Sequence, residues 1–183
     1  MTRTGLMFPR MMRIAMVLAA TMLAQVAGAD VMRFVGAFEG SATVVSADGS
    51  AHKRDMSVEI AQTLTGFSVA WSTNTYRADG STKEKSYLVE FVGSDRADVY
   101  SSAMKRNVFG HDVQLDPMRG EPYVWSRING DTLSVYSLFV APDGGYEIQQ
   151  FDRTLADGGL TLDYKSVRNG EVQRTVSTFL ERQ

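Results

Sequence analysis

The chain has 183 residues, of which 44% are hydrophobic and 22% are charged, with a formal net charge of −2. One domain with a real hydrophobic core is the natural expectation at this length. The chain contains no cysteine, which excludes disulfides, thiolate nucleophiles and thiolate metal sites.

Residues 1 to 29 have the three parts of a secretory signal peptide. A region with three arginines is followed by an apolar run at residues 14 to 23 and by the small residues Ala27, Gly28 and Ala29. The alternative is a transmembrane anchor, but the run is short for a hydrocarbon core of about 30 Å. We therefore expect cleavage after Ala29 and export of a soluble protein to the periplasm or the cell exterior.

The mature chain would be a single domain at residues 30 to 183. It holds 16 basic residues, because three of the 19 lie in the leader, against 21 acidic residues, for a net charge of −5. An acidic exported protein is a poor candidate for binding nucleic acid or an anionic membrane surface. No later stretch is apolar enough to span a membrane.

Ten short segments alternate apolar and polar residues and are separated by turn residues. A period of two is typical of half-buried strands, and Asp48-Gly49, Asp79-Gly80 and Asn129-Gly130 are hairpin turn signals. The predicted strands lie at about 37–46, 56–61, 67–72, 85–91, 98–101, 123–128, 132–141, 146–155, 160–167 and 171–180. The seventh is apolar on both faces and is expected to be the most buried. Residues 104 to 122 break this rhythm, as lids and binding loops do.

The strand order predicts an all-β fold. Tight turns between successive strands favour an antiparallel up-and-down meander of about ten strands, and a sheet of that length tends to close into a barrel, which removes its edges. An immunoglobulin-like sandwich is the less favoured alternative, because it would need Greek-key crossovers.

The opening Gly36-Ala37-Phe38, followed by this meander, resembles the calycin superfamily of lipocalins, fatty-acid-binding proteins and their bacterial relatives. The resemblance implies a calycin-like β-barrel. It also implies that Phe38 stands where these proteins usually have Trp, under a basic residue of the last strand, here Arg182 or Arg174. The heme-binding relatives of nitrobindin type use a His near the C-terminus, which this chain lacks, so no heme and no other cofactor is expected.

Two sets of side chains are candidates for a ligand site. The first hairpin places six apolar side chains on alternate positions, and these form either a cavity lining or a packed core: Phe67, Val69, Trp71, Tyr87, Val89 and Phe91. The second set is Tyr123, Trp125 and Arg127. If that face points inward, Arg127 is a buried cation that needs an anionic partner, such as a ligand carboxylate or phosphate. The alternative is an Arg127 on the outer face.

Motifs for other chemistry are weak. His111, Asp112 and Asp116 form the one cluster that resembles a metal or acid–base site, and a metal usually needs three or more well-spaced ligands, so a solvated loop is the favoured interpretation. The chain has no Gly-x-Ser-x-Gly nucleophile motif and no phosphate-binding glycine loop before a helix.

These observations leave three hypotheses. The first is an exported β-barrel that binds a small apolar or amphipathic molecule in its interior through Phe67, Trp71, Tyr87, Phe91, Tyr123, Trp125 and Arg127. The second is an envelope interaction or structural protein with a filled barrel. The third is an isomerase or lyase that uses the cavity with a buried general base, for which Glu90 and Asp152 are the strand acids to inspect.

Overall fold

The computed structural model of the protein describes residues 31–45, 49–102, 105–106, 112–113 and 115–183. The expected signal peptide and His111 of the candidate metal cluster lie outside the described residues.

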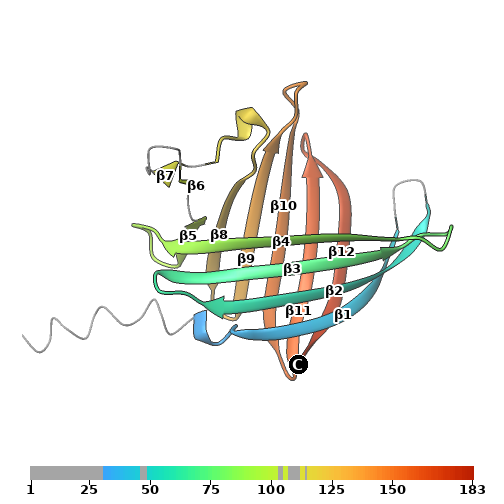
Figure 1. The fold of residues 1–183 in the computed structure, drawn as a ribbon, viewed down its shortest axis with the longest axis horizontal. Coiled ribbons are helices and arrows are strands. Elements are labelled where there is room, and N and C mark those ends of the chain that lie inside the picture. Colours follow the sequence, from blue (N-terminus) through green and yellow to red (C-terminus); the bar gives the residue numbers. More distant parts are fainter. Residues whose placement is uncertain (1–30, 46–48, 103–104, 107–111, 114) are drawn as a thin grey trace, which may run out of the picture.

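The chain folds into a closed antiparallel barrel of ten strands, as the sequence predicted (Figure 1). The barrel strands are β1 (Gly36–Val45), β2 (Ala51–Gln62), β3 (Gly66–Tyr76), β4 (Thr82–Gly93), β5 (Val99–Ser102), β8 (Tyr123–Asn129), β9 (Thr132–Val140), β10 (Tyr146–Ala156), β11 (Gly159–Arg168) and β12 (Glu171–Arg182). Each strand pairs with the next one in the barrel, and β12 pairs with β1 to close the circle. The order is therefore up-and-down, with no crossover.

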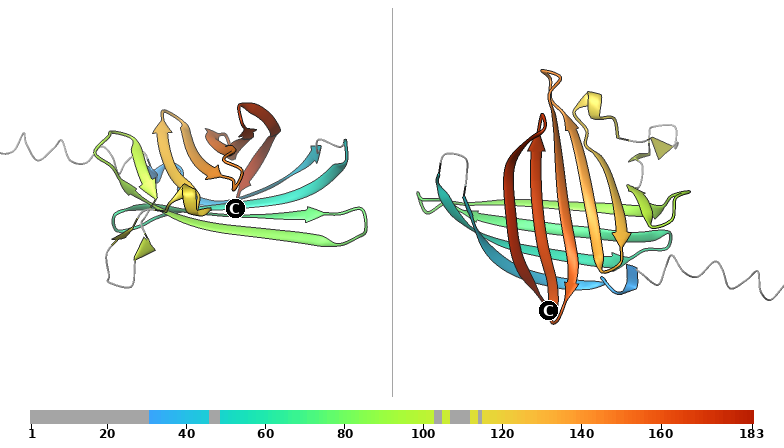
Figure 2. Two further views of the ribbon diagram at one scale, coloured as in Figure 1. Left: turned by 90° about the horizontal axis from the view of Figure 1, so that it is seen from above. Right: turned by 180° about the vertical axis from the view of Figure 1, so that it is seen from behind.

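Figure 1 shows β1–β4 running across β8–β12 at a steep angle, and Figure 2 shows the same two groups of strands from above and from behind. The space between the two groups is the barrel interior. No residue of β9 is exposed, in agreement with its apolar character on both faces.

The segment between β5 and β8 contains short elements outside the barrel. These are a two-stranded sheet of β6 (Lys105–Arg106) and β7 (Asp112–Val113) and a 3-10 turn, η1 (Pro117–Arg119). Asp116 caps η1 by accepting a hydrogen bond from the backbone of Met118, and Gly120 ends it with a positive φ of 77°. Asp116 is thus occupied as a helix cap.

The hydrophobic core fills one end of the barrel. Residues 31 to 34 form a helical turn, and their side chains Val31 and Phe34 are buried against the inner faces of the strands. Phe38, Phe67 and Phe91 lie in the same cluster and are fully buried. The opposite end of the interior has a different character, because the inward side chains there are largely polar.

The aromatic residue of the opening motif has the partner expected for it. The guanidinium carbon of Arg182 lies 4.5 Å from the ring centre of Phe38, and Arg182 donates a hydrogen bond of 2.8 Å to the backbone carbonyl of Val35. A Cβ at Gly36 would lie 2.3 Å from that guanidinium, so Gly36 makes room for it. Arg182, and not Arg174, is therefore the cation over Phe38.

Candidate functional site: a cavity lined by arginines

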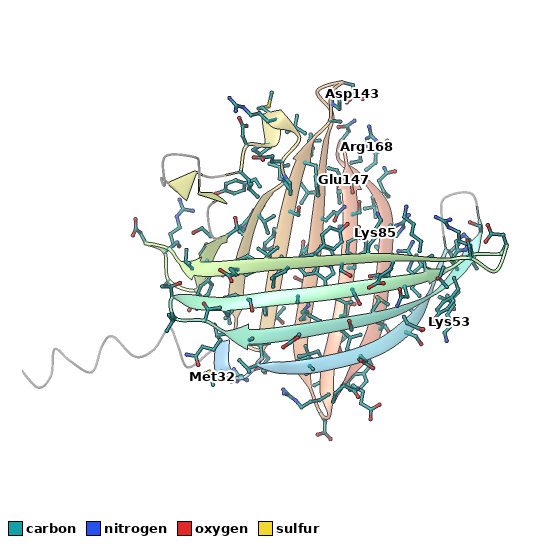
Figure 3. The ribbon with its side chains drawn as sticks, in the orientation of Figure 1. Met32, Lys53, Lys85, Asp143, Glu147 and Arg168 are labelled. Atoms are coloured by element: carbon teal, nitrogen blue, oxygen red, sulfur yellow. The ribbon has the colours of Figure 1, made fainter. Side chains whose placement is uncertain are left out.

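The end of the barrel away from Phe34 holds a cavity of about 640 Å³. Its walls are inward-facing side chains of β2, β3, β4, β10, β11 and β12, together with Val44 of β1. The exposed side chains Lys83, Lys85 and Arg168 lie at its mouth. Figure 3 labels Lys85, Glu147 and Arg168, which lie where β10 and β11 extend beyond the edge of β4. A volume of this size suits a small organic molecule.

Arg153 of β10 is the most unusual residue of the lining. Its side chain is only 2% exposed, and its register partners are Leu133 on β9 and Leu162 on β11, both buried. Within the described part of the chain, its Nε and Nη1 atoms have no hydrogen-bond partner. A buried cation without such partners is costly, and burial lowers the pKa of Arg153 to about 10.

The carboxylate of the preceding residue, Asp152, does not pair with Arg153. Asp152 raises the pKa of Arg153 a little by its charge, but its own side chain lies on the outer face of the strand. There it accepts hydrogen bonds from Ser134 and Gln150. The guanidinium of Arg153 is therefore open to an anion that enters the cavity.

Four aromatic rings form a row across the interior. Tyr87 of β4 stacks on Trp71 of β3 with 5.2 Å between ring centres, Trp71 lies 5.6 Å from Phe151 of β10, and Phe151 lies 4.8 Å from Tyr164 of β11. The guanidinium carbon of Arg153 is 5.8 Å from the Trp71 ring centre and 5.6 Å from that of Phe151. This aromatic row gives the cavity an apolar wall, and its rings offset part of the cost of burying Arg153.

Besides Arg153, a pair of arginines lies nearer the mouth of the cavity. Arg54 of β2 and Arg174 of β12 are half-buried, and each has a buried Nε atom without a hydrogen-bond partner among the described residues. Burial, and then the charge of Arg174, lowers the pKa of Arg54, so the two cations lie close enough to repel each other. Burial also raises the pKa of Tyr164, while Arg174 and Arg54 each oppose that rise. Tyr164 therefore links this arginine pair to the aromatic row.

Glu147 of β10 is the single acidic side chain among the described residues of the cavity lining. It accepts hydrogen bonds from Gln149 at 2.8 Å and from Ser166 at 2.9 Å. No described arginine or lysine forms an ion pair with Glu147. Arg168 at the mouth pairs instead with Asp143 at 3.7 Å, and no ion pair joins the other cations of the lining to a described acid.

The charge of the cavity is opposite to that of the chain. The lining includes six basic side chains against Glu147, whereas acidic residues outnumber basic ones in the whole sequence. The six are Arg54, Lys83, Lys85, Arg153, Arg168 and Arg174. Because like charges gathered in a cleft focus the local potential, the cavity should attract small anions.

The first set of candidate residues is divided between cavity and core. Trp71 and Tyr87 line the cavity. Phe67 and Phe91 are fully buried in the core, where their rings stack with 5.0 Å between centres. The two interpretations of this hairpin, cavity lining and packed core, thus apply to opposite ends of the same two strands.

The second set lies on the outside of the barrel. The inward positions of β8 are Val124, Ser126 and Ile128, all buried, and the alternate positions are Tyr123, Trp125 and Arg127. Arg127 is exposed, which corrects the expectation of a buried cation at that position. Trp125 stacks on Tyr136 of β9 at 5.0 Å, also on the outer face. The inward face of β8 carries small and aliphatic side chains, and its aromatic side chains lie on the outer face. The aromatic residues of β8 therefore did not indicate which face lines the interior.

Sequence reasoning missed the three interior arginines. Alternate residues of β10 face inward, and Arg153 is one of them: Glu147, Gln149, Phe151, Arg153 and Leu155. Arg174 faces inward on β12 because it is opposite the buried Ser166 of β11. The useful signal was register: Phe151 pairs with Val135, an apolar residue in the middle of the buried strand β9. A basic residue two positions from Phe151 on the same face had to point inward as well.

The strand acids considered for catalysis face outward. Glu90 is exposed, and it pairs with Ser68 on the face opposite to Phe91. Asp152 is engaged on the outer face as described above. Among the described residues no group of three or more His, Cys, Asp or Glu side chains comes together as a metal site would require.

Comparisons with known proteins add no relative. No protein-family model matches the chain, and no curated protein matches it. Among the described residues, no helix is both long enough and apolar enough to cross a membrane. The geometry of the cavity is therefore the main indication of function.

Proposed function

We propose that this protein binds a small amphipathic anion inside the barrel. The observation that carries the proposal is the fully buried Arg153, whose Nε and Nη1 lack partners in the described chain and which borders a cavity of about 640 Å³. A ligand carboxylate or phosphate would supply the hydrogen bonds that Arg153 lacks, and charge-assisted hydrogen bonds to arginine are among the strongest in proteins. This assignment moves the head-group role from Arg127 to Arg153.

The apolar part of the ligand would lie against the aromatic row. Trp71 and Phe151 flank Arg153, so an anionic group at Arg153 would bring the adjoining apolar atoms into contact with those two rings. Ligand sites of this kind bury an apolar body and use a few polar groups for selectivity.

The calycin resemblance supports the same proposal. The contact of Arg182 with Phe38 is the one that the resemblance implied, and barrels of that superfamily hold small molecules. Export by the signal-like segment at residues 1 to 29 would place the binding protein outside the cytoplasm. The mass of the protein recovered from the periplasm of an expression host would test cleavage after Ala29.

Tryptophan fluorescence can test the binding directly. The chain has two tryptophans, and replacing the outer one, Trp125→Phe, leaves Trp71 in the cavity as the reporter. We expect dodecanoate to change this fluorescence and dodecanol to bind about ten-fold more weakly, because only the carboxylate pairs with Arg153. In Arg153→Met the preference for dodecanoate should disappear, whereas Arg127→Met, an exposed control, should keep it.

Two outcomes would contradict the proposal. One is equal affinity for dodecanoate and dodecanol, and the other is unchanged dodecanoate binding in Arg153→Met. Native mass spectrometry of the protein as purified provides an independent check, since a co-purified anion would add a mass that is lost on denaturation.

A further inference from the structure

The cations of the cavity are arranged at two levels. Arg153 is opposite Leu162 of β11, whereas Arg174 is opposite Ser166, which in turn is opposite Gln149 of β10. Gln149 and Arg153 are four residues apart on one strand, which is about 13 Å along the strand at 3.3 Å per residue. The backbone positions of Arg153 and Arg174 are therefore well separated. In agreement with this, the charges of Arg54 and Arg174 are not among the causes that shift the pKa of Arg153, whereas Arg174 does lower the pKa of Arg54.

Arg54 and Arg174 form the outer level, and this level is a candidate anion site separate from Arg153. Arg54 and Arg174 come from strands on either side of β1, and their mutual repulsion is reflected in the lowered pKa of Arg54. Each keeps a buried Nε without a partner in the described part of the protein. Two neighbouring guanidinium groups of this kind are a suitable environment for an oxyanion.

On the wall formed by β10 and β11, aromatic rings lie between the two levels. Phe151 and Tyr164 are opposite each other in the register and lie between the position of Arg153 and that of Gln149. Glu147, the single described acid of the lining, is held by Gln149 and Ser166 and neutralises at most one of the six cations. The pattern is thus cation, aromatic wall, cation.

We propose that the ligand carries two oxyanion groups, one at each end of an apolar body, with the inner group on Arg153 and the outer group on Arg54 and Arg174. This inference rests on the proposed function and adds the charge and shape of the ligand. A ligand with one acidic group would leave the Arg54–Arg174 repulsion in place, whereas a ligand with two would relieve it.

The test compares α,ω-dicarboxylates with monocarboxylates of equal length, from octanedioate to hexadecanedioate, with Trp71 fluorescence in the Trp125→Phe protein. One length of dicarboxylate should bind about ten-fold more tightly than its monocarboxylate, as expected for one added charged hydrogen-bond site. In the double variant Arg54→Gln/Arg174→Gln this advantage should be lost, while monocarboxylate affinity changes by less than about three-fold.

A matched control removes two positive charges from the outer face. Arg127→Gln/Lys165→Gln changes the net charge equally, and both residues are exposed. This control should retain the dicarboxylate advantage. The melting temperature of Arg54→Gln/Arg174→Gln without ligand should not fall, because the variant removes a repulsion.

The outcomes separate the two proposals. If monocarboxylates bind through Arg153 but no dicarboxylate binds more tightly, the two-anion inference is wrong and the proposed function stands. If neither class binds, the proposed function itself is wrong. An advantage that persists in Arg54→Gln/Arg174→Gln would place the second anion elsewhere and overturn the assignment of the outer site.

Discussion

Arg153 holds a positive charge in a position where an apolar residue would be more stable. The lowering of its pKa by burial, to about 10, corresponds to a penalty on the order of 3 kcal/mol. The neighbouring rings of Trp71 and Phe151 offset part of this cost. A protein that keeps such a residue sacrifices stability at a position where ligand binding would recover it.

We therefore predict that Arg153→Met stabilises the ligand-free protein by about 1 to 3 kcal/mol, measured by urea denaturation. The exposed control Arg127→Met should change the free energy of unfolding by less than about 0.5 kcal/mol. A loss of stability in Arg153→Met would show that the guanidinium is satisfied by hydrogen bonds in solution.

The pH dependence of this difference follows from the direction of the pKa shift. The unfolded chain holds the Arg153 proton more tightly than the folded protein does, so the penalty is fully present below about pH 10 and is relieved as the pH rises from there toward the ordinary pKa of arginine. The stability difference between Arg153→Met and the parent should consequently be constant between about pH 6 and 9. A difference that varied within that range would point to another titrating group.

At the scale of elements, the hairpin of β3 and β4 depends on one glycine for close approach. A Cβ at Gly66 would lie 2.0 Å from the backbone oxygen of Phe91, and the backbone of β4 cannot move without disturbing the buried Phe91 ring. Gly93, the last residue of β4 and the neighbour of Val92, which pairs with Gly66, has open space around its Cβ position.

We predict that Gly66→Ala lowers the free energy of unfolding by about 2 kcal/mol or more, and that Gly93→Ala changes it by less than about 0.5 kcal/mol. Thermal or urea unfolding of both variants provides the measurement. Equal effects would mean that the pairing of β3 with β4 tolerates a shift at Gly66.

At the scale of the whole molecule, the barrel is closed unevenly. β10 and β11 pair from Glu147 with Arg168 through to Ala156 with Gly159. β1 and β12, by contrast, pair only at Phe38 with Arg182 and at Glu39 with Glu181. The seam thus closes at the end that holds the hydrophobic core, and no register pair joins the two strands where Val44 and Arg174 line the cavity.

We predict that backbone amides in β10 and β11 exchange with solvent most slowly, whereas those of β12 from Glu171 to Ser177 that face the seam exchange through local opening. Hydrogen exchange followed by NMR or mass spectrometry resolves this difference. Slow exchange along the whole seam would contradict it. An opening there would also give a ligand a lateral route to Arg174.

The sequence determined the fold to a large extent by itself. Strict alternation and turn residues such as Asn129-Gly130 are local signals, and a meander needs only neighbouring strands to pair, so ten strands and their order followed from the chain. The contact of Phe38 with a basic residue of the last strand could also be predicted from the sequence, because the last strand lies next to the first in any closed meander.

Only the tertiary structure decided which face of each strand is inside and which end of the barrel is filled. Alternation divides residues into two faces but does not label them, and a shift of one position exchanges the faces. For that reason the sequence left open whether Arg127 faces inward or outward, and Arg153 was overlooked. Phe67 and Trp71 lie on the same face of β3, yet one is in the core and the other lines the cavity. This division depends on the crossing of β1–β4 over β8–β12 and on Phe34, which fills one end of the barrel. Both are long-range packing effects that no local sequence pattern records.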